Sequence, residues 1–181
     1  KETVTEFGQS IEGIIKNENF YRGANFRISQ PPELLKISSH TWDSVILDSA
    51  TKDDIELNTI GFLKNTRRLA KLGVPCKRGV ILSGCPGTGK TILCKALMAK
   101  SGKITCITTD PYYLDEACYI RAVYEMAADL KPSLVFIEDL DQIGQGRVEY
   151  GWRQAPALNT LLEVLDGVEE NVGVVTIATT N

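Results

Sequence analysis

Hydrophobic and polar positions divide the chain into a short N-terminal segment and a longer, regularly alternating region. Between residues 3 and 15 the apolar side chains recur at helical spacing, which predicts a short amphipathic helix. Residues 20–28 contain two aromatic-rich runs around a turn at Gly23 and predict a hairpin, and residues 34–37 predict a further short strand. We therefore expect residues 1–40 to form a small α+β segment whose role the pattern does not reveal.

From residue 51 onward, stretches of helical periodicity alternate with short, continuous apolar runs. A helix is expected over residues 51–72, with Thr51 as its cap and Asp54 in its first turn. The apolar runs predict strands at residues 80–82, 104–107, 134–137 and 172–178, and the periodic stretches predict helices near residues 93–98, 114–128 and 157–165. Strands separated by helices require crossover connections, so the fold class is α/β, with a mostly parallel sheet between two layers of helices. Strands buried on both faces also explain the absence of alternation.

The composition excludes several classes of protein. The chain has 181 residues, 43% of them hydrophobic, which is enough for one core domain. Twenty basic and twenty-three acidic side chains give a net charge of −3, so no overall positive field attracts nucleic acid, and we expect no nucleic-acid partner. The longest apolar runs are far shorter than the roughly 20 residues that span a bilayer. We expect no membrane span and no signal peptide in this chain.

The five cysteines are scattered, and with a single histidine they offer no zinc-binding spacing. They are typical of reduced thiols in a cytoplasmic protein, and buried structural cysteine is the ordinary interpretation of each. Only Cys85 lies in a segment with functional character. The chain begins at Lys1 without a methionine and stops at Asn181 directly after an apolar run, so we interpret it as a fragment.

The segment from Gly84 to Thr91 fits the phosphate-binding pattern G-x-x-x-x-G-K-[ST] in full. Its glycines let the backbone curl so that successive N–H groups point at a phosphate chain, and the following helix offers its positive N-terminal end. Lys90 would reach the β- and γ-phosphates, and the Thr91 hydroxyl would bind Mg²⁺. The predicted nucleotide-binding residues of this segment are Gly84, Cys85, Pro86, Gly87, Thr88, Gly89, Lys90, Thr91 and Ile92.

Polar residues also follow two of the predicted strands. Glu138 and Asp139 come directly after the run at residues 134–137, and ligand sites of open α/β sheets lie at the carboxyl ends of strands. One carboxylate there would hold the magnesium shell, and the other would orient and activate a water molecule. Asn181 follows the last apolar run, where it would hydrogen-bond the attacking water or a γ-phosphate oxygen. A simple strand-end turn is the alternative for this asparagine.

Together these motifs resemble the AAA+ ATPases, in particular the AAA subgroup of protein unfoldases and remodelling machines. The matching segments are Gly84–Thr91 (Walker A), Phe136–Asp141 (Walker B), Leu162–Gly167 (the L-x-x-x-D-G stretch) and Ala178–Asn181 (the strand end with the sensor-1 asparagine). The resemblance implies a nucleotide-binding core over residues 41–181. It also implies ATP hydrolysis with Mg²⁺ by a homo-hexameric ring that remodels a protein client.

The resemblance assigns roles by position. Glu138 takes the magnesium-site role, with Thr91 as the other metal ligand, and Asp139 takes the catalytic role with Asn181. The usual order in the family is Asp-Glu, and the shorter aspartate requires the water to sit closer or to be reached through a second water. Hydrolysis is therefore expected either to be slow or to rely on a small backbone shift, and it is not abolished because both carboxylates remain. The segment before residue 51 resembles one whose backbone contacts adenine in relatives. That role is carried to Val45 and Ile46.

Two features of the family have no counterpart here. Relatives that thread a polypeptide carry an aromatic-hydrophobic-glycine pore loop, whereas this chain has Tyr112 and Tyr113 without a nearby glycine. The arginine fingers and the helical lid of the family follow the sensor-1 asparagine, so the core is expected to be truncated at Asn181. Without trans arginines, the fragment alone is expected to hydrolyse ATP weakly.

Two other functions remain open from the residues. The first is a nucleotide-dependent scaffold or assembly module with little turnover, which the swapped order of Glu138 and Asp139 favours. The second is a P-loop kinase for a small molecule. The strand end at residues 179–181 and the stretch at residues 165–167 argue against that kinase.

Overall fold

The computed structural model describes residues 21–29, 31–36, 40–114, 116–143, 156–166 and 172–181. The helix expected over residues 3–15 lies outside the described residues, as do residue 20 of the expected hairpin and residue 37 of the short strand that follows it.

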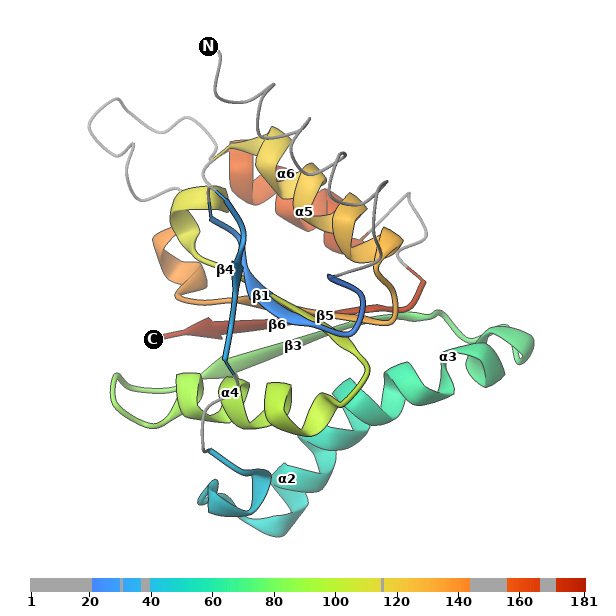
Figure 1. Ribbon diagram of the computed structural model, residues 1–181, viewed down its shortest axis with the longest axis vertical. Coiled ribbons are helices and arrows are strands. Elements are labelled where there is room, and N and C mark those ends of the chain that lie inside the picture. The colour runs from blue at the N-terminus through green and yellow to red at the C-terminus, as the bar shows by residue number, and fades with distance from the viewer. Residues whose placement is uncertain (1–20, 30, 37–39, 115, 144–155, 167–171) are drawn as a thin grey trace.

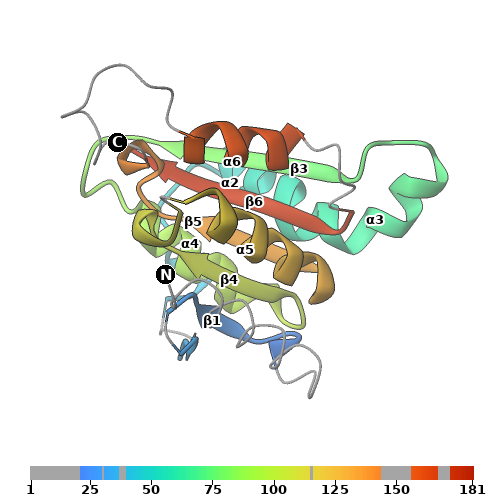
Figure 2. The same ribbon diagram turned by 90° about the horizontal axis from the view of Figure 1, so that it is seen from above.

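Among the described residues, six strands form one mixed sheet in the order β2-β1-β4-β5-β6-β3. The strands are β1 (Asn25–Arg27), β2 (Glu33–Leu34), β3 (Lys77–Ser83), β4 (Thr105–Thr109), β5 (Ser133–Ile137) and β6 (Val174–Thr180). Every neighbouring pair is parallel except β1 and β2, which are antiparallel. Figure 2 shows β4, β5, β6 and β3 side by side, with helices on both faces. The predicted α/β class with a mostly parallel sheet is confirmed.

Helices cover both faces of the sheet. They are α2 (Ser49–Glu56), α3 (Phe62–Lys71), α4 (Lys90–Ser101), α5 (Ala117–Asp129) and α6 (Pro156–Asp166). In Figure 1, α5 and α6 lie above the sheet, and α2, α3 and α4 lie below it. This arrangement is the predicted three-layer αβα sandwich.

The strands contribute to two separate cores because successive side chains point to opposite faces. In β5, Val135 and Ile137 pack with α5 and α6. Leu134 and Phe136 pack with α4 on the other face. All four side chains are buried, which explains the continuous apolar run in the sequence.

Within residues 21–28, which the structure describes, the expected hairpin does not form, because β1 joins the main sheet. β1 pairs in parallel with β4, and its antiparallel partner is β2, further along the chain. Gly23, at φ +76°, donates its N–H to the Thr105 hydroxyl at 2.9 Å, which turns the chain onto the sheet. In this position the side chains of Phe26 and Ile28 are completely buried in the core that α5 covers. An isolated hairpin would have left both side chains largely exposed to water.

The first core helix begins earlier than predicted and is not continuous. Asp48, not Thr51, is the N-cap, because its carboxylate accepts the Thr51 N–H at 2.9 Å. Hydrogen bonds from the side chain and backbone of Thr51 lower the pKa of the Asp48 carboxyl. A π-helical turn at Leu57–Gly61 separates α2 from α3.

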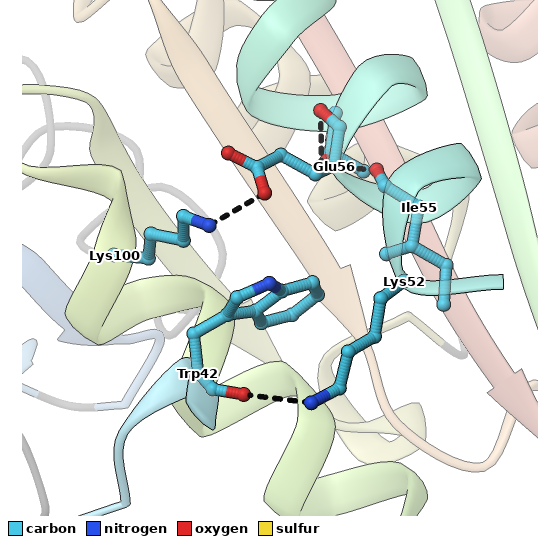
Figure 3. A network of polar contacts seen from close by, with 6 residues as sticks. Trp42, Lys52, Ile55, Glu56 and Lys100 are labelled. Carbon is cyan, nitrogen blue, oxygen red and sulfur yellow. Dashed lines mark hydrogen bonds and ion pairs between the residues drawn. The ribbon is translucent and has the colours of Figure 1, made fainter. Parts of the chain in front are cut away.

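Trp42 attaches the segment before α2 to the helices of the lower layer. It begins a 3₁₀ turn (Trp42–Ser44), and the Lys100 ammonium of α4 lies 5.0 Å from the centre of its ring. Lys100 also pairs with Glu56 of α2, and the Lys52 ammonium donates to the Trp42 carbonyl at 3.4 Å. Figure 3 shows how this network joins three elements.

The packing of the buried face of α4 against the sheet holds the first turn of this helix next to the glycine loop. A substitution on that face tests how much the packing contributes to stability. We expect Leu97→Ala to lower the free energy of unfolding by about 2 to 5 kcal/mol, because Leu97 is fully buried and truncation leaves a cavity. The control is Leu162→Ala on α6, where the side chain is 49% exposed and the expected loss is within about 0.5 kcal/mol. Urea denaturation measures both. Equal losses would contradict the packing described for α4.

Candidate functional site

The glycine loop occupies residues 84–89, between β3 and α4, as the sequence predicts. Gly87 and Gly89 have φ values of +81° and +92°, in the left-handed region that side chains with a Cβ rarely adopt. Thr88 donates to the Cys85 carbonyl from both its N–H, at 3.3 Å, and its hydroxyl, at 2.8 Å. These contacts close the loop into a compact turn.

The N-terminal end of α4 faces the loop with free backbone donors. Its N-cap, Gly89, provides no side-chain acceptor, and Leu93 is the residue whose N–H reaches the Gly89 carbonyl, at 2.9 Å. The N–H groups of Lys90, Thr91 and Ile92 therefore have no carbonyl partner within the helix. The helix dipole places partial positive charge at the same end, which favours an anion there.

Lys90 connects the loop to the end of β6. Its ammonium donates to the Gly84 carbonyl, to the Cys85 carbonyl at 3.2 Å and to Asn181 Oδ1 at 2.9 Å. The backbone N–H of Gly84 also reaches the Thr180 carbonyl at 3.3 Å. The structure thus brings together the predicted lysine and the predicted asparagine, 91 residues apart in the sequence.

Glu138 extends β5 by one residue on the face that carries α4. Its N–H donates to the Thr109 carbonyl at 3.3 Å, so the strand alternation continues and the side chain shares the face of Phe136. It lies close enough to Cys94 to affect that thiol. Burial raises the pKa of Cys94 to about 12, and the negative charge of Glu138 adds to the effect.

Asp139 leaves the strand in a different direction. Its backbone is left-handed, with φ +50° and ψ +55°, a conformation that aspartate adopts more readily than most residues with a Cβ. Its N–H donates to the Thr179 hydroxyl of β6 at 3.1 Å. The backbone therefore turns between the two neighbouring acids, Glu138 continuing β5 and Asp139 meeting the end of β6.

Asp141 belongs to the same cluster, although sequence reasoning gave it no role. Its Oδ1 accepts the Thr180 hydroxyl at 3.2 Å and the Asn181 N–H at 3.3 Å, so it holds the end of β6 in place. Thr179, which supports Asp139, was also missed. The available signal was a third carboxylate two residues after Asp139, but only the neighbouring positions of β5 and β6 show what it contacts.

The residues expected near adenine lie on the segment before α2. Val45 is buried in the core with α4, so its side chain is not free to contact a ligand. Ile46 is 98% exposed. No hydrogen bond or core contact described in the structure links either residue to the glycine loop.

The aromatic pair considered for a pore loop lies in a short 3₁₀ turn, Pro111–Leu114. Tyr113 is partly buried and packs against the core under α5. The side chain of Tyr112 lies outside the described residues. This packing gives Tyr113 a structural role in the core.

Two oxygen donors, one at the start of α4 and one at the end of β5, are of a kind that suits magnesium. Thr91 offers a hydroxyl and Glu138 a carboxylate, and Mg²⁺ is commonly held by one or two such groups together with phosphate oxygens. Among the described residues, no group of three or more His, Cys, Asp or Glu side chains gathers to form a self-contained metal cage. The donor set therefore fits a metal that arrives with a phosphate ligand. In the same part of the chain, no helix has the length and apolar character needed to cross a membrane.

Comparison with known proteins agrees with this geometry. The family model described as "ATPase family associated with various cellular activities (AAA)" matches residues 80–181, from β3 to the end of β6. The chain is 32% identical over 184 residues to the ATP-dependent zinc metalloprotease FtsH of Mycoplasma pneumoniae, covering 97% of this chain and 26% of that protein.

Similar matches occur in other bacteria. FtsH 2 of Salinibacter ruber is 34% identical over 150 residues, covering 78% of this chain and 22% of the relative. FtsH 3 of Sorangium cellulosum is 36% identical over 134 residues, covering 68% and 22%. The chain spans about a quarter of the length of these relatives. Because the family model covers more than half of the chain, from within β3 to the end of β6, the chain belongs to the AAA family of ATPases.

Proposed function

We propose that the chain binds Mg·ATP at the glycine loop and hydrolyses it, and that hydrolysis drives remodelling of a protein or protein complex. The observation that carries the proposal is the hydrogen bond from Lys90 to Asn181, at 2.9 Å. It places the end of β6 beside the loop, and the same strand end contacts Asp139 through Thr179. A triphosphate lying along the loop would therefore end among the groups expected to act on its terminal phosphate.

Binding would use the backbone donors first. The N–H groups at residues 90–92 and the curled loop would hold the phosphates, and Lys90 would exchange its carbonyl partners for β- and γ-phosphate oxygens. Thr91 and Glu138 would hold the magnesium ion, which when bound neutralises charge that develops on the phosphates. Val45 and Ile46 would contact the adenine through their backbone.

Hydrolysis would depend on Asp139. Its carboxylate would orient a water molecule and accept a proton as the water oxygen attacks the γ-phosphorus. The bond from that phosphorus to the bridging oxygen would break, releasing ADP and phosphate. Asn181, held by Asp141, would hydrogen-bond the water or a γ-phosphate oxygen. The left-handed backbone of Asp139 supports this role because it turns the residue out of the strand toward the end of β6.

The assembly and the client are also proposals. Relatives are named as ATP-dependent zinc metalloproteases, which supports the proposal that the molecule remodelled by ATP hydrolysis is a protein. We propose a homo-hexameric ring, as the family resemblance implies, with nucleotide between subunits. We further propose a cytoplasmic location, which the free state of all five cysteines supports.

A nucleotide-dependent scaffold is the second candidate. The observation that favours it is the short side chain of Asp139 at the position expected to activate water. If that carboxylate does not reach the water, ATP would organise the assembly without rapid turnover. Measured turnover separates the two functions, because a scaffold requires binding but not hydrolysis.

The contribution of Lys90 to binding can be measured directly. We expect Lys90→Ala to weaken Mg·ATP binding by about 10- to 100-fold, because a charge-assisted hydrogen bond is worth about 1.5 to 3 kcal/mol. Isothermal titration calorimetry on the folded chain gives the affinity. Lys64→Ala, an exposed lysine on α3, is the matched control and should bind normally. If the Lys90 variant bound Mg·ATP with unchanged affinity, the proposal that the glycine loop binds the nucleotide would be wrong.

The role of Asp139 predicts a separation of binding from turnover. Asparagine also tolerates the left-handed backbone, so Asp139→Asn should preserve the fold and bind Mg·ATP within about threefold of the unmodified chain. Phosphate release should fall by about 100- to 10,000-fold, the usual contribution of a general base. Asp53→Asn on the exposed face of α2 is the control. Equal turnover by the Asp139 variant would exclude Asp139 as the base.

Cysteine labelling gives an independent test of where the nucleotide binds. Exposed Cys85 should react with iodoacetamide, and Mg·ATP should protect it because the nucleotide would cover the loop. Exposed Cys118 is the internal control, since nucleotide should not change its rate. Cys94 and Cys106 should react slowly throughout, because burial raises the pKa of each thiol to about 12 and leaves little thiolate at pH 8. Mass spectrometry measures each site, and lack of protection at Cys85 would contradict the proposed location.

A further inference from the structure

A pocket opens on the α4 face of the sheet, at the edge that β1 extends. Its volume is about 210 Å³, and its polar lining comes from β1, the chain after β2, α4, β4 and the end of β5. We call it the Arg27 pocket. The polar side chains that line it are Asn25, Arg27, Lys36, Lys95, Thr108 and Glu138. No residue of the glycine loop is part of its lining.

Two polar atoms in this lining are buried and have no hydrogen-bond partner among the described residues. They are Thr108 Oγ1, on a side chain that is 3% exposed, and Asn25 Oδ1. Arg27 stands opposite Thr108 in the parallel register of β1 and β4, and Asn25 shares the face of Arg27. A buried polar group without a partner costs about 1 to 3 kcal/mol, so two around one cavity indicate that a ligand supplies the missing partners.

The charges around the pocket indicate the sign of that ligand. Arg27, Lys36 and Lys95 contribute three positive charges and Glu138 one negative charge, a net of two positive charges. Within the described residues, no ion pair engages any of the three cations. All three side chains are exposed, so water screens their mutual repulsion, but together they attract an anion to the cavity. A divalent anion matches the net charge, whereas one carboxylate would neutralise only half of it.

The volume of the pocket and its two uncharged polar side chains limit which anion it can bind. The volume is below the roughly 300 to 1,000 Å³ of pockets for drug-sized ligands, so a second nucleotide does not fit. Hydrogen phosphate offers oxygens that accept from Thr108, Arg27 and the lysines. It also carries one O–H that can donate to Asn25 Oδ1. We propose that the Arg27 pocket is a binding site for hydrogen phosphate, separate from the glycine loop and bordered by Glu138.

The experiment titrates inorganic phosphate into the whole chain by calorimetry at low ionic strength. Lys90→Ala serves as the background, because it weakens any phosphate binding at the glycine loop. We expect one remaining site, and Arg27→Gln should weaken it by about tenfold or more, since it removes a charge-assisted contact. Arg67→Gln, which removes the same charge from the exposed face of α3, is the control and should change nothing.

Thr108→Val separates a ligand contact from a structural one. It should weaken phosphate binding while leaving the midpoint of thermal unfolding unchanged or raised, because the lost hydroxyl has no hydrogen-bond partner in the part of the chain that the structure describes. Sulfate should bind less tightly than phosphate, since it has the same shape but no O–H to donate to Asn25 at neutral pH. Absence of phosphate binding, unchanged binding in the Arg27 variant, or equal affinity for sulfate would overturn the proposal.

Discussion

The parallel pairing of β6 with both β3 and β5 is the constraint on which the candidate site depends. The register runs from Lys77 opposite Val174 to Ser83 opposite Thr180, so β6 ends where the glycine loop begins. The same strand pairs with β5 up to Ile137, one residue before the two acids. A slip of one residue would turn Thr179 to the opposite face and remove the support of Asp139. Strand register therefore assembles groups that lie 39 to 91 residues apart in the sequence.

The change of direction between Glu138 and Asp139 gives two adjacent acids different surroundings. Glu138 continues the alternation of β5 and borders α4, where its charge affects Cys94. Asp139 adopts a left-handed backbone and meets Thr179 instead. A strand alone would separate neighbouring side chains onto opposite faces of the sheet. The left-handed residue instead turns the chain at the sheet edge, so the backbone and not the residue order determines where each carboxylate lies.

β1 and β2 extend the sheet beyond β4, and this extension places polar side chains on the face of the sheet that α4 covers. Phe26 and Ile28 complete the core under α5, which explains why β1 joins this sheet and does not form a separate hairpin. The same pairing necessarily turns Asn25 and Arg27 toward α4. The apolar positions of β1 thus account for its attachment, and the polar positions account for the pocket beside Glu138. The sheet extension that buries Phe26 and Ile28 therefore also creates the Arg27 pocket on the α4 face.

The sequence by itself determined the alternating α/β order, the glycine loop from Gly84 and the acids after β5, because helical periodicity, buried strands and loop glycines are local properties of the chain. It did not determine that β1 pairs with β4, since an edge strand and a hairpin strand have the same alternation of apolar side chains. The contacts of Asp141 were also hidden, because they depend on which strands are neighbours. Only the tertiary structure decided these points, since strand order and register are set by the burial of side chains distant in the sequence.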